Sequence, residues 1–158
     1  MNCNIKINHL RNIIILVTLT FLFFSVKPVY AQEQSIDYIY FDDGSKIKVI
    51  TIIEENTSGI TLFTTTKTKN VTKIFERSSD NNVVCGLMKL TGTFQYNGST
   101  SKATKVSMTV SGKNNWSCIS KKSSKSGASV YGYAAFKKGS SLTSIEGKIT
   151  CTKNGTIK

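Results

Sequence analysis

The chain has 158 residues, 39% of them hydrophobic and 19% charged, and its 21 Lys and Arg against 9 Asp and Glu give a formal net charge of +12. This length suits one domain with a sizeable core, and the positive charge favours anionic partners. The only histidine is His9, so sites that need several imidazoles, such as the usual zinc hydrolase sites, are excluded.

Residues 1–31 have the parts of a secretory signal peptide. Lys6 and Arg11 form a basic region, an apolar run follows from Ile13 to Val26, and Val29–Tyr30–Ala31 suits a signal peptidase. A retained membrane anchor is the alternative, but the uncharged run from Asn12 to Val26 has 15 residues, which is short for a span of about 20. We predict cleavage after Ala31, secretion, no stable membrane insertion afterwards, and one mature domain at 32–158.

The mature chain begins with a predicted β-hairpin. The Asp42–Ser45 turn separates the β-rich runs Ile36–Phe41 and Lys46–Ile53, and an Asp-Gly turn between such runs is typical of a hairpin. In the second run Ile50 and Ile52 lie opposite the other apolar residues. We therefore expect the end of this strand to be buried on both sides.

Two further strands are expected before a turn at residues 78–82. Ile60–Thr66 consists of β-branched and aromatic residues, and Asn70–Arg77 alternates apolar and polar residues. Composition favours a turn after Arg77 because Ser, Asp and Asn dominate there.

The longest alternation in the sequence belongs to a strand that starts near Val83 and ends at the Asn97–Gly98 turn. One face of this strand is apolar, with Gly92 as the only gap. Gly92 predicts either a β-bulge or the close approach of a neighbouring aromatic ring. The apolar residues of this face are Met88, Leu90, Phe94 and Tyr96.

The C-terminal part also consists of short β-type runs separated by turns, and no mature segment shows the apolar spacing of a helix. We expect strands at 103–110, 116–120, 128–136 and 144–152, and the Lys- and Ser-rich Lys121–Gly127 as the most loop-like segment. Eight or nine short strands in one domain predict an all-β fold, an antiparallel β-sandwich or a small open barrel.

Charge is distributed unevenly along the mature chain. Residues 32–80 hold six basic and eight acidic residues, whereas residues 81–158 hold twelve lysines and only Glu146. Such a polycationic half favours, in this order, wall polymers, acidic polysaccharides, lipid headgroups and nucleic acid. The alternative is that outward lysines only keep a β protein soluble and protect its edges.

Three cysteines remain after cleavage: Cys85, Cys118 and Cys151. In an exported protein this number predicts one disulfide and one free thiol, in any of three pairings, while buried thiols are the alternative. For Cys118, Lys121 and Lys122 suggest a thiolate of lowered pKa, but a buried or disulfide-bonded residue is the favoured interpretation.

The mature chain offers little for catalysis. Without an imidazole it lacks the base of Ser-His-Asp and Cys-His sites. Asp42–Asp43 and Glu54–Glu55 are pairs of neighbouring carboxylates. Neighbours in a strand point to opposite faces, and carboxylates in turns usually accept backbone hydrogen bonds, so neither pair is expected to act on one bond. Calcium binding at the Asp42–Ser45 turn is an alternative that hairpin geometry makes unnecessary. We predict no enzyme, no catalytic residue, no metal and no cofactor.

A binding site is expected among the lysines and aromatic residues of the C-terminal half. Aromatic residues such as Trp116 and Phe136 form either a sugar-stacking platform or the core, which is the default for alternating positions. We expect an anionic cell-wall or surface polymer as partner, and no nucleic acid. The predicted binding residues are Lys105, Lys113, Trp116, Lys121, Lys122, Lys125, Tyr131, Tyr133, Lys137 and Lys138.

With these motifs placed, the sequence resembles a group of small secreted β-rich proteins from clostridia and related Gram-positive bacteria. The shared features are the signal peptide, the turn Asp43–Gly44–Ser45, Thr91–Gly98, Trp116 followed by Lys121–Gly127, and Thr150–Gly155. Members of that group carry a cysteine where this chain has Ala103 and a tryptophan near Gly86. The resemblance therefore implies that Cys151 has lost its partner, which leaves Cys85 and Cys118 as the candidate pair.

Three functions fit the sequence. The first is a secreted, non-catalytic protein that binds an anionic surface polymer through its basic half. The second is a bacteriocin-like or toxin-like protein that acts on other cells. The third is a structural subunit of a surface assembly. The sequence leaves the ligand, the sheet order and the oligomeric state open.

Overall fold

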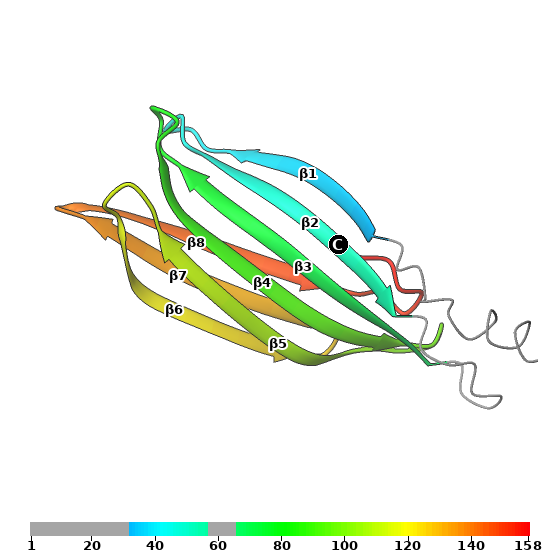
Figure 1. Cartoon of the computed structure of the whole chain (residues 1–158). Coiled ribbons are helices and arrows are strands. Elements are labelled where there is room, and N and C mark those ends of the chain that lie inside the picture. Colours follow the sequence, from blue (N-terminus) through cyan, green and yellow to red (C-terminus); the bar gives the residue numbers. More distant parts are fainter. Residues whose placement is uncertain (1–31, 57–65) are drawn as a thin grey trace, which may run out of the picture.

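We describe the protein from a computed structural model, which covers residues 32–56 and 66–158. Antiparallel strands form two sheets, and no helix occurs in these ranges (Figure 1). The predicted all-β fold is confirmed, while the signal peptide at 1–31 and most of the strand expected at Ile60–Thr66 lie outside the described residues. The strands are β1 (Gln32–Tyr40), β2 (Lys46–Asn56), β3 (Lys67–Ser78), β4 (Val84–Tyr96), β5 (Ser101–Gly112), β6 (Ser117–Ser126), β7 (Ser129–Lys138) and β8 (Ser141–Thr150).

The first sheet has the strand order β1-β2-β3-β4-β5, so each strand pairs with its neighbour in sequence. The Asp42–Ser45 segment closes the first hairpin as predicted, with Gly44 at a φ of 77° that favours glycine. Gly98, at a φ of 85°, has the same role in the predicted turn after β4. Hairpin connections of this kind keep consecutive strands adjacent.

The apolar face of β4 lies in the core, as its alternation predicts. Met88, Leu90 and Phe94 are fully buried. A Cβ atom on Gly92 would lie 2.7 Å from the ring of Phe94 and 2.9 Å from Cγ2 of Val130 on β7. Close approach of an aromatic ring therefore explains Gly92, and the register shift between β4 and β5 comes at the next residues, Thr93 and Phe94.

The second sheet has the order β6-β7-β8 and corrects two sequence predictions. Lys121–Gly127 is not a loop, because nearly all of it belongs to β6, whose ten residues are all exposed. A strand exposed on both faces needs no apolar alternation. Strands β7 and β8 are also longer than predicted, since a two-residue turn, Gly139–Ser140, joins them directly.

The two sheets face each other, with β7 against β4 and β8 against β3 (Figure 1). Phe136 and Ile145 from the second sheet are fully buried against Phe75 and Met88 from the first. The inner face of β2 also belongs to the core, where Ile47 and Val49 are buried. Ile50 and Ile52 lie on the outer face of β2, which points away from the second sheet, and they are only half-buried. The expected burial of both faces of this strand is therefore wrong.

Residues 151–158 fold back over one end of the two sheets. The Lys69 Nζ atom donates a hydrogen bond to the carbonyl oxygen of Gly155 at 3.0 Å, and Gly98 N donates one to the carbonyl oxygen of Lys153 at 2.8 Å. Thr150 and Lys158 exchange two backbone hydrogen bonds of 3.0 and 2.9 Å. The last residue thus pairs with the last residue of β8.

The predicted disulfide is absent from the described residues, because all three cysteines are free thiols. Cys85 is buried in β4, Cys151 is buried directly after β8, and Cys118 is exposed on β6. The thiols of Cys85, Cys118 and Cys151 donate hydrogen bonds to the backbone carbonyl oxygens of Val83, Ser120 and Thr152, respectively. Burial raises the pKa of Cys85 and of Cys151.

Candidate functional site

The outer face of the three-stranded sheet carries the most promising site. Tyr131 and Tyr133 alternate with the buried residues of β7 and are 38% and 37% exposed. Register places Tyr131 between Ser124 and Lys148, and Tyr133 between Lys122 and Glu146. These six side chains, with the backbone of Gly132 and Gly147, line an open groove of about 500 Å³. We call them the tyrosine face: Lys122, Ser124, Tyr131, Tyr133, Glu146 and Lys148.

The tyrosine face combines aromatic rings with charges of both signs. The Lys148 Nζ atom lies 5.6 Å from the ring centroid of Tyr131, a cation–π contact. Lys122 stands on the other flank, on β6. Glu146 is the only carboxylate that lines the groove. The arrangement can therefore stack a flat apolar ligand surface and pair with an anion on either side, but it cannot supply two carboxylates to one bond.

The structure brings three of the ten predicted binding residues together, namely Lys122, Tyr131 and Tyr133. Lys137 lies at the end of β7 on the same face, outside the groove. Lys121 and Lys125 are on the opposite face of β6, since they pair with the inward residues Ala134 and Val130.

The remaining predicted residues serve other parts of the molecule. Lys105 lies on the outer face of the five-stranded sheet, and Lys113 precedes Trp116 in the turn after β5. Trp116 packs against the core, and Phe136 is fully buried, so both follow the default of core packing, and the prediction of Trp116 as a binding residue finds no place in the groove. Lys138 ends β7 outside the groove.

Ser124, Glu146 and Lys148 complete the site and were missed from the sequence. Their partner positions depend on the register of three strands. For Glu146 and Lys148 a signal existed, because Gly139–Ser140 is a two-residue hairpin sequence and Gly139 has a φ of 60°. Recognising this turn sets Lys148 opposite Tyr131.

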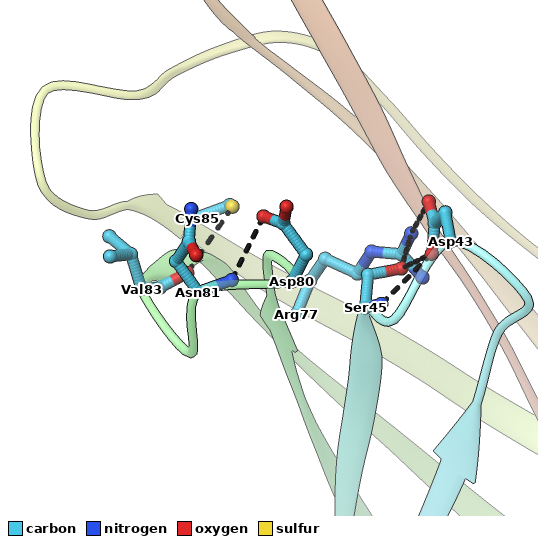
Figure 2. Close-up of polar contacts among 7 residues, drawn as sticks. All are labelled: Asp43, Ser45, Arg77, Asp80, Asn81, Val83 and Cys85. Atoms are coloured by element: carbon cyan, nitrogen blue, oxygen red, sulfur yellow. Dashed lines mark hydrogen bonds and ion pairs between the residues drawn. The ribbon is translucent and has the colours of Figure 1, made fainter.

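The Asp42–Ser45 turn forms a second polar cluster, which Figure 2 shows with its neighbours. Asp43 Oδ1 accepts hydrogen bonds from the backbone nitrogen of Ser45 at 2.9 Å and from its hydroxyl. Arg77 donates to the Ser45 hydroxyl oxygen at 2.7 Å and lies 3.8 Å from Asp43 Oδ2. The guanidinium of Arg77 also stacks on Phe41, 4.1 Å from the ring centroid.

These contacts commit the Asp43 carboxylate to the turn. Hydrogen bonds from Ser45, and more weakly the charge of Arg77, hold the pKa of Asp43 below its usual value. Over residues 32–56 and 66–158, no group of three His, Cys, Asp or Glu side chains is placed to hold a metal ion. The cluster is best explained as a device that fixes the first hairpin.

Comparisons with protein-family models, with curated proteins and with solved structures find no match. The resemblance to small secreted proteins of Gram-positive bacteria therefore stays a prediction. Within the part of the chain that the structure describes, no helix has the length and apolar character to cross a bilayer. Function is inferred below from the geometry of the tyrosine face.

Proposed function

We propose that the protein is a secreted, non-catalytic β-sandwich domain that binds an anionic surface polysaccharide through the tyrosine face. The observation that carries this proposal is the position of Tyr131 and Tyr133 between Lys122 on one strand and Lys148 on the other. The net charge of +11 in residues 81–158 supports an anionic partner.

The spacing of the two tyrosines suits a chain of sugar rings. Residues two apart on a strand are about 7 Å apart and point the same way. Each ring can stack on the apolar face of a sugar, while its hydroxyl stays in water. Lys122 and Lys148 then meet the carboxylates or phosphates of the polymer, and Ser124 and Glu146 can accept hydrogen bonds from sugar hydroxyls.

Binding without cleavage is the outcome that these side chains support. Glycoside hydrolysis generally uses two carboxyl groups that flank the bond, about 5 to 9.5 Å apart. Glu146 has no such partner among the residues that line the groove. The only histidine, His9, belongs to the predicted signal peptide, so an imidazole is not expected in the mature protein.

The proposal is tested by retention on purified Gram-positive cell wall, with dextran beads as an uncharged sugar control. The Lys122→Gln/Lys148→Gln variant should lose retention. The matched control is Lys89→Gln/Lys105→Gln, which removes two exposed lysines from the outer face of the other sheet. Raising salt from about 50 to 500 mM should weaken wild-type retention sharply. Equal loss in both variants, or retention that salt leaves unchanged, would contradict the proposal.

A further inference from the structure

The exposed tyrosines of the described chain come in two pairs. Tyr131 and Tyr133 belong to the tyrosine face, whereas Tyr38 and Tyr40 on β1 are 48% and 72% exposed and lie outside its groove. Residues two apart on a strand point to the same face, so each pair presents two rings side by side. The β1 pair therefore repeats the Tyr-x-Tyr spacing of the tyrosine face.

Lysines lie directly opposite both tyrosines of β1. The register pairs Tyr38 with Lys48 and Tyr40 with Lys46 on β2. Glu76 on β3 is the direct partner of Lys48 on its other side. We call these five side chains the second tyrosine face: Tyr38, Tyr40, Lys46, Lys48 and Glu76.

The tyrosine face has the same arrangement. Tyr131 is opposite Lys148, and Tyr133 lies between Lys122 and Glu146. Each of the four exposed tyrosines in residues 32–56 and 66–158 thus has a lysine as a direct strand partner, and each surface includes one glutamate. A shared arrangement of aromatic rings, cations and one carboxylate suits a shared class of ligand.

The two surfaces point in opposite directions. Ile47 and Val49, which alternate with the lysines of β2, are buried in the core. Lys46, Lys48 and the tyrosines opposite them therefore lie on the outer face of the five-stranded sheet. The tyrosine face lies on the outer face of the three-stranded sheet, and the two sheets meet through the core (Figure 1). A ligand bound on one surface leaves the other free.

The rings of the second tyrosine face support each other. Their centroids are 6.2 Å apart, and their planes differ by 25°. Rings that pack together lose less freedom when a sugar stacks on them, which favours binding. Lys46 and Lys48 supply two cations against the one carboxylate of Glu76. The strand residues of this surface therefore suit carboxylates or phosphates on the ligand.

We propose that the second tyrosine face is a second site for the anionic polysaccharide, so that one molecule joins two polymer chains. This inference rests on the proposed function, because it assigns the same ligand class to both faces. The second site is the weaker one, since β1 is the edge of its sheet and lysines flank its tyrosines on one side only. Retention therefore depends on the tyrosine face, and the second site holds a neighbouring chain where the polymer is concentrated.

The test is whether the protein cross-links soluble polysaccharide released from purified Gram-positive cell wall. Light scattering should rise as wild-type protein is added and fall again in excess, because each polymer segment is then occupied by its own protein molecule. Tyr38→Ala/Tyr40→Ala should reduce the scattering to that of the polysaccharide alone but keep retention on cell wall. Lys46→Gln/Lys48→Gln, which leaves both rings in place, should have the same effect.

The matched control is Ile39→Ala. Ile39 lies between the two tyrosines, points to the opposite face and is 47% exposed, so cross-linking should be unchanged. Cross-linking that persists in both double variants, equal loss in Ile39→Ala, or a wild type that is retained but never cross-links would overturn the second site and leave the proposed function standing. A wild type that cell wall does not retain would overturn both.

Discussion

Lys148 of β8 lies over the ring of Tyr131 of β7, with its Nζ atom 5.6 Å from the ring centroid. The two residues are direct partners across neighbouring strands. A cation held over an aromatic ring loses little freedom when an anion arrives, which favours binding. This contact therefore couples the aromatic and the charged parts of the tyrosine face.

Replacing the tyrosines should weaken polysaccharide binding without unfolding the protein. Tyr131→Ala and Tyr133→Ala are each expected to lower the affinity about tenfold, because each removes an exposed stacking surface. Affinity electrophoresis in gels that contain soluble wall polysaccharide measures the effect. Ile119→Ala, on the neighbouring strand β6, is the control. If Ile119→Ala lowers the affinity as much as the tyrosine variants do, the aromatic contribution is refuted.

Gly92→Val should destabilise the fold strongly. A Cβ at this position would come within 2.7 Å of the Phe94 ring and 2.9 Å of Val130 Cγ2, and overpacking of a core costs about 1 to 3 kcal/mol. Urea unfolding gives the free energy of unfolding. The double variant Gly92→Ala/Phe94→Leu should lose less unfolding free energy than the sum of the losses of the two single variants. An unchanged stability of Gly92→Val would show that the inward face of β4 is assigned incorrectly.

Asp43→Asn should lower the thermal midpoint at pH 7, and its difference from the wild type should shrink as the pH falls below 3.8. The pKa of Asp43 is depressed below 3.8 in the folded protein, so its ionised form favours folding. This contribution is complete above the unfolded pKa and is lost as pH falls through the lower folded pKa. Thermal unfolding across this range measures it, with Asp42→Asn in the same turn as control. A difference between wild type and Asp43→Asn that does not shrink at all as the pH falls would argue against a charge effect.

Thiol labelling should distinguish the three cysteines. Cys118 is exposed, whereas Cys85 and Cys151 are buried and burial raises the pKa of both thiols. A maleimide reagent at neutral pH should therefore modify Cys118 first, and the other two only after unfolding. Peptide mapping without reductant identifies each labelled site. A Cys85–Cys118 disulfide in protein purified without reductant would contradict the free thiols of the structure.

The strand around Met88 could be predicted because local pattern and tertiary environment agree there. Its apolar residues alternate and face the second sheet, and its turn residues have the φ values that a hairpin needs. Strand β6 could not be predicted in the same way. All of its residues are exposed, so its pairing with β7 leaves no periodic apolar signal.

The prediction that the outer face of β2 is buried was wrong for a different reason. Ile50 and Ile52 look like core residues in the sequence, but no strand of the second sheet covers that face. Whether a second face is covered depends on contacts between distant segments, which the local pattern does not contain. The tyrosine face shows the same limit, since Lys122 and Lys148 come from different strands on either side of β7.

The most direct test of the proposed function is to map the bound surface by amide chemical shifts in two-dimensional NMR. Isotope-labelled protein is titrated with soluble fragments of an anionic wall polysaccharide. We expect the shift changes to concentrate on Lys122, Ser124, Tyr131, Tyr133, Glu146 and Lys148, which line one groove. Changes spread over Lys89, Lys102 and Lys105 of the other sheet, with none on β7, would contradict binding at the tyrosine face.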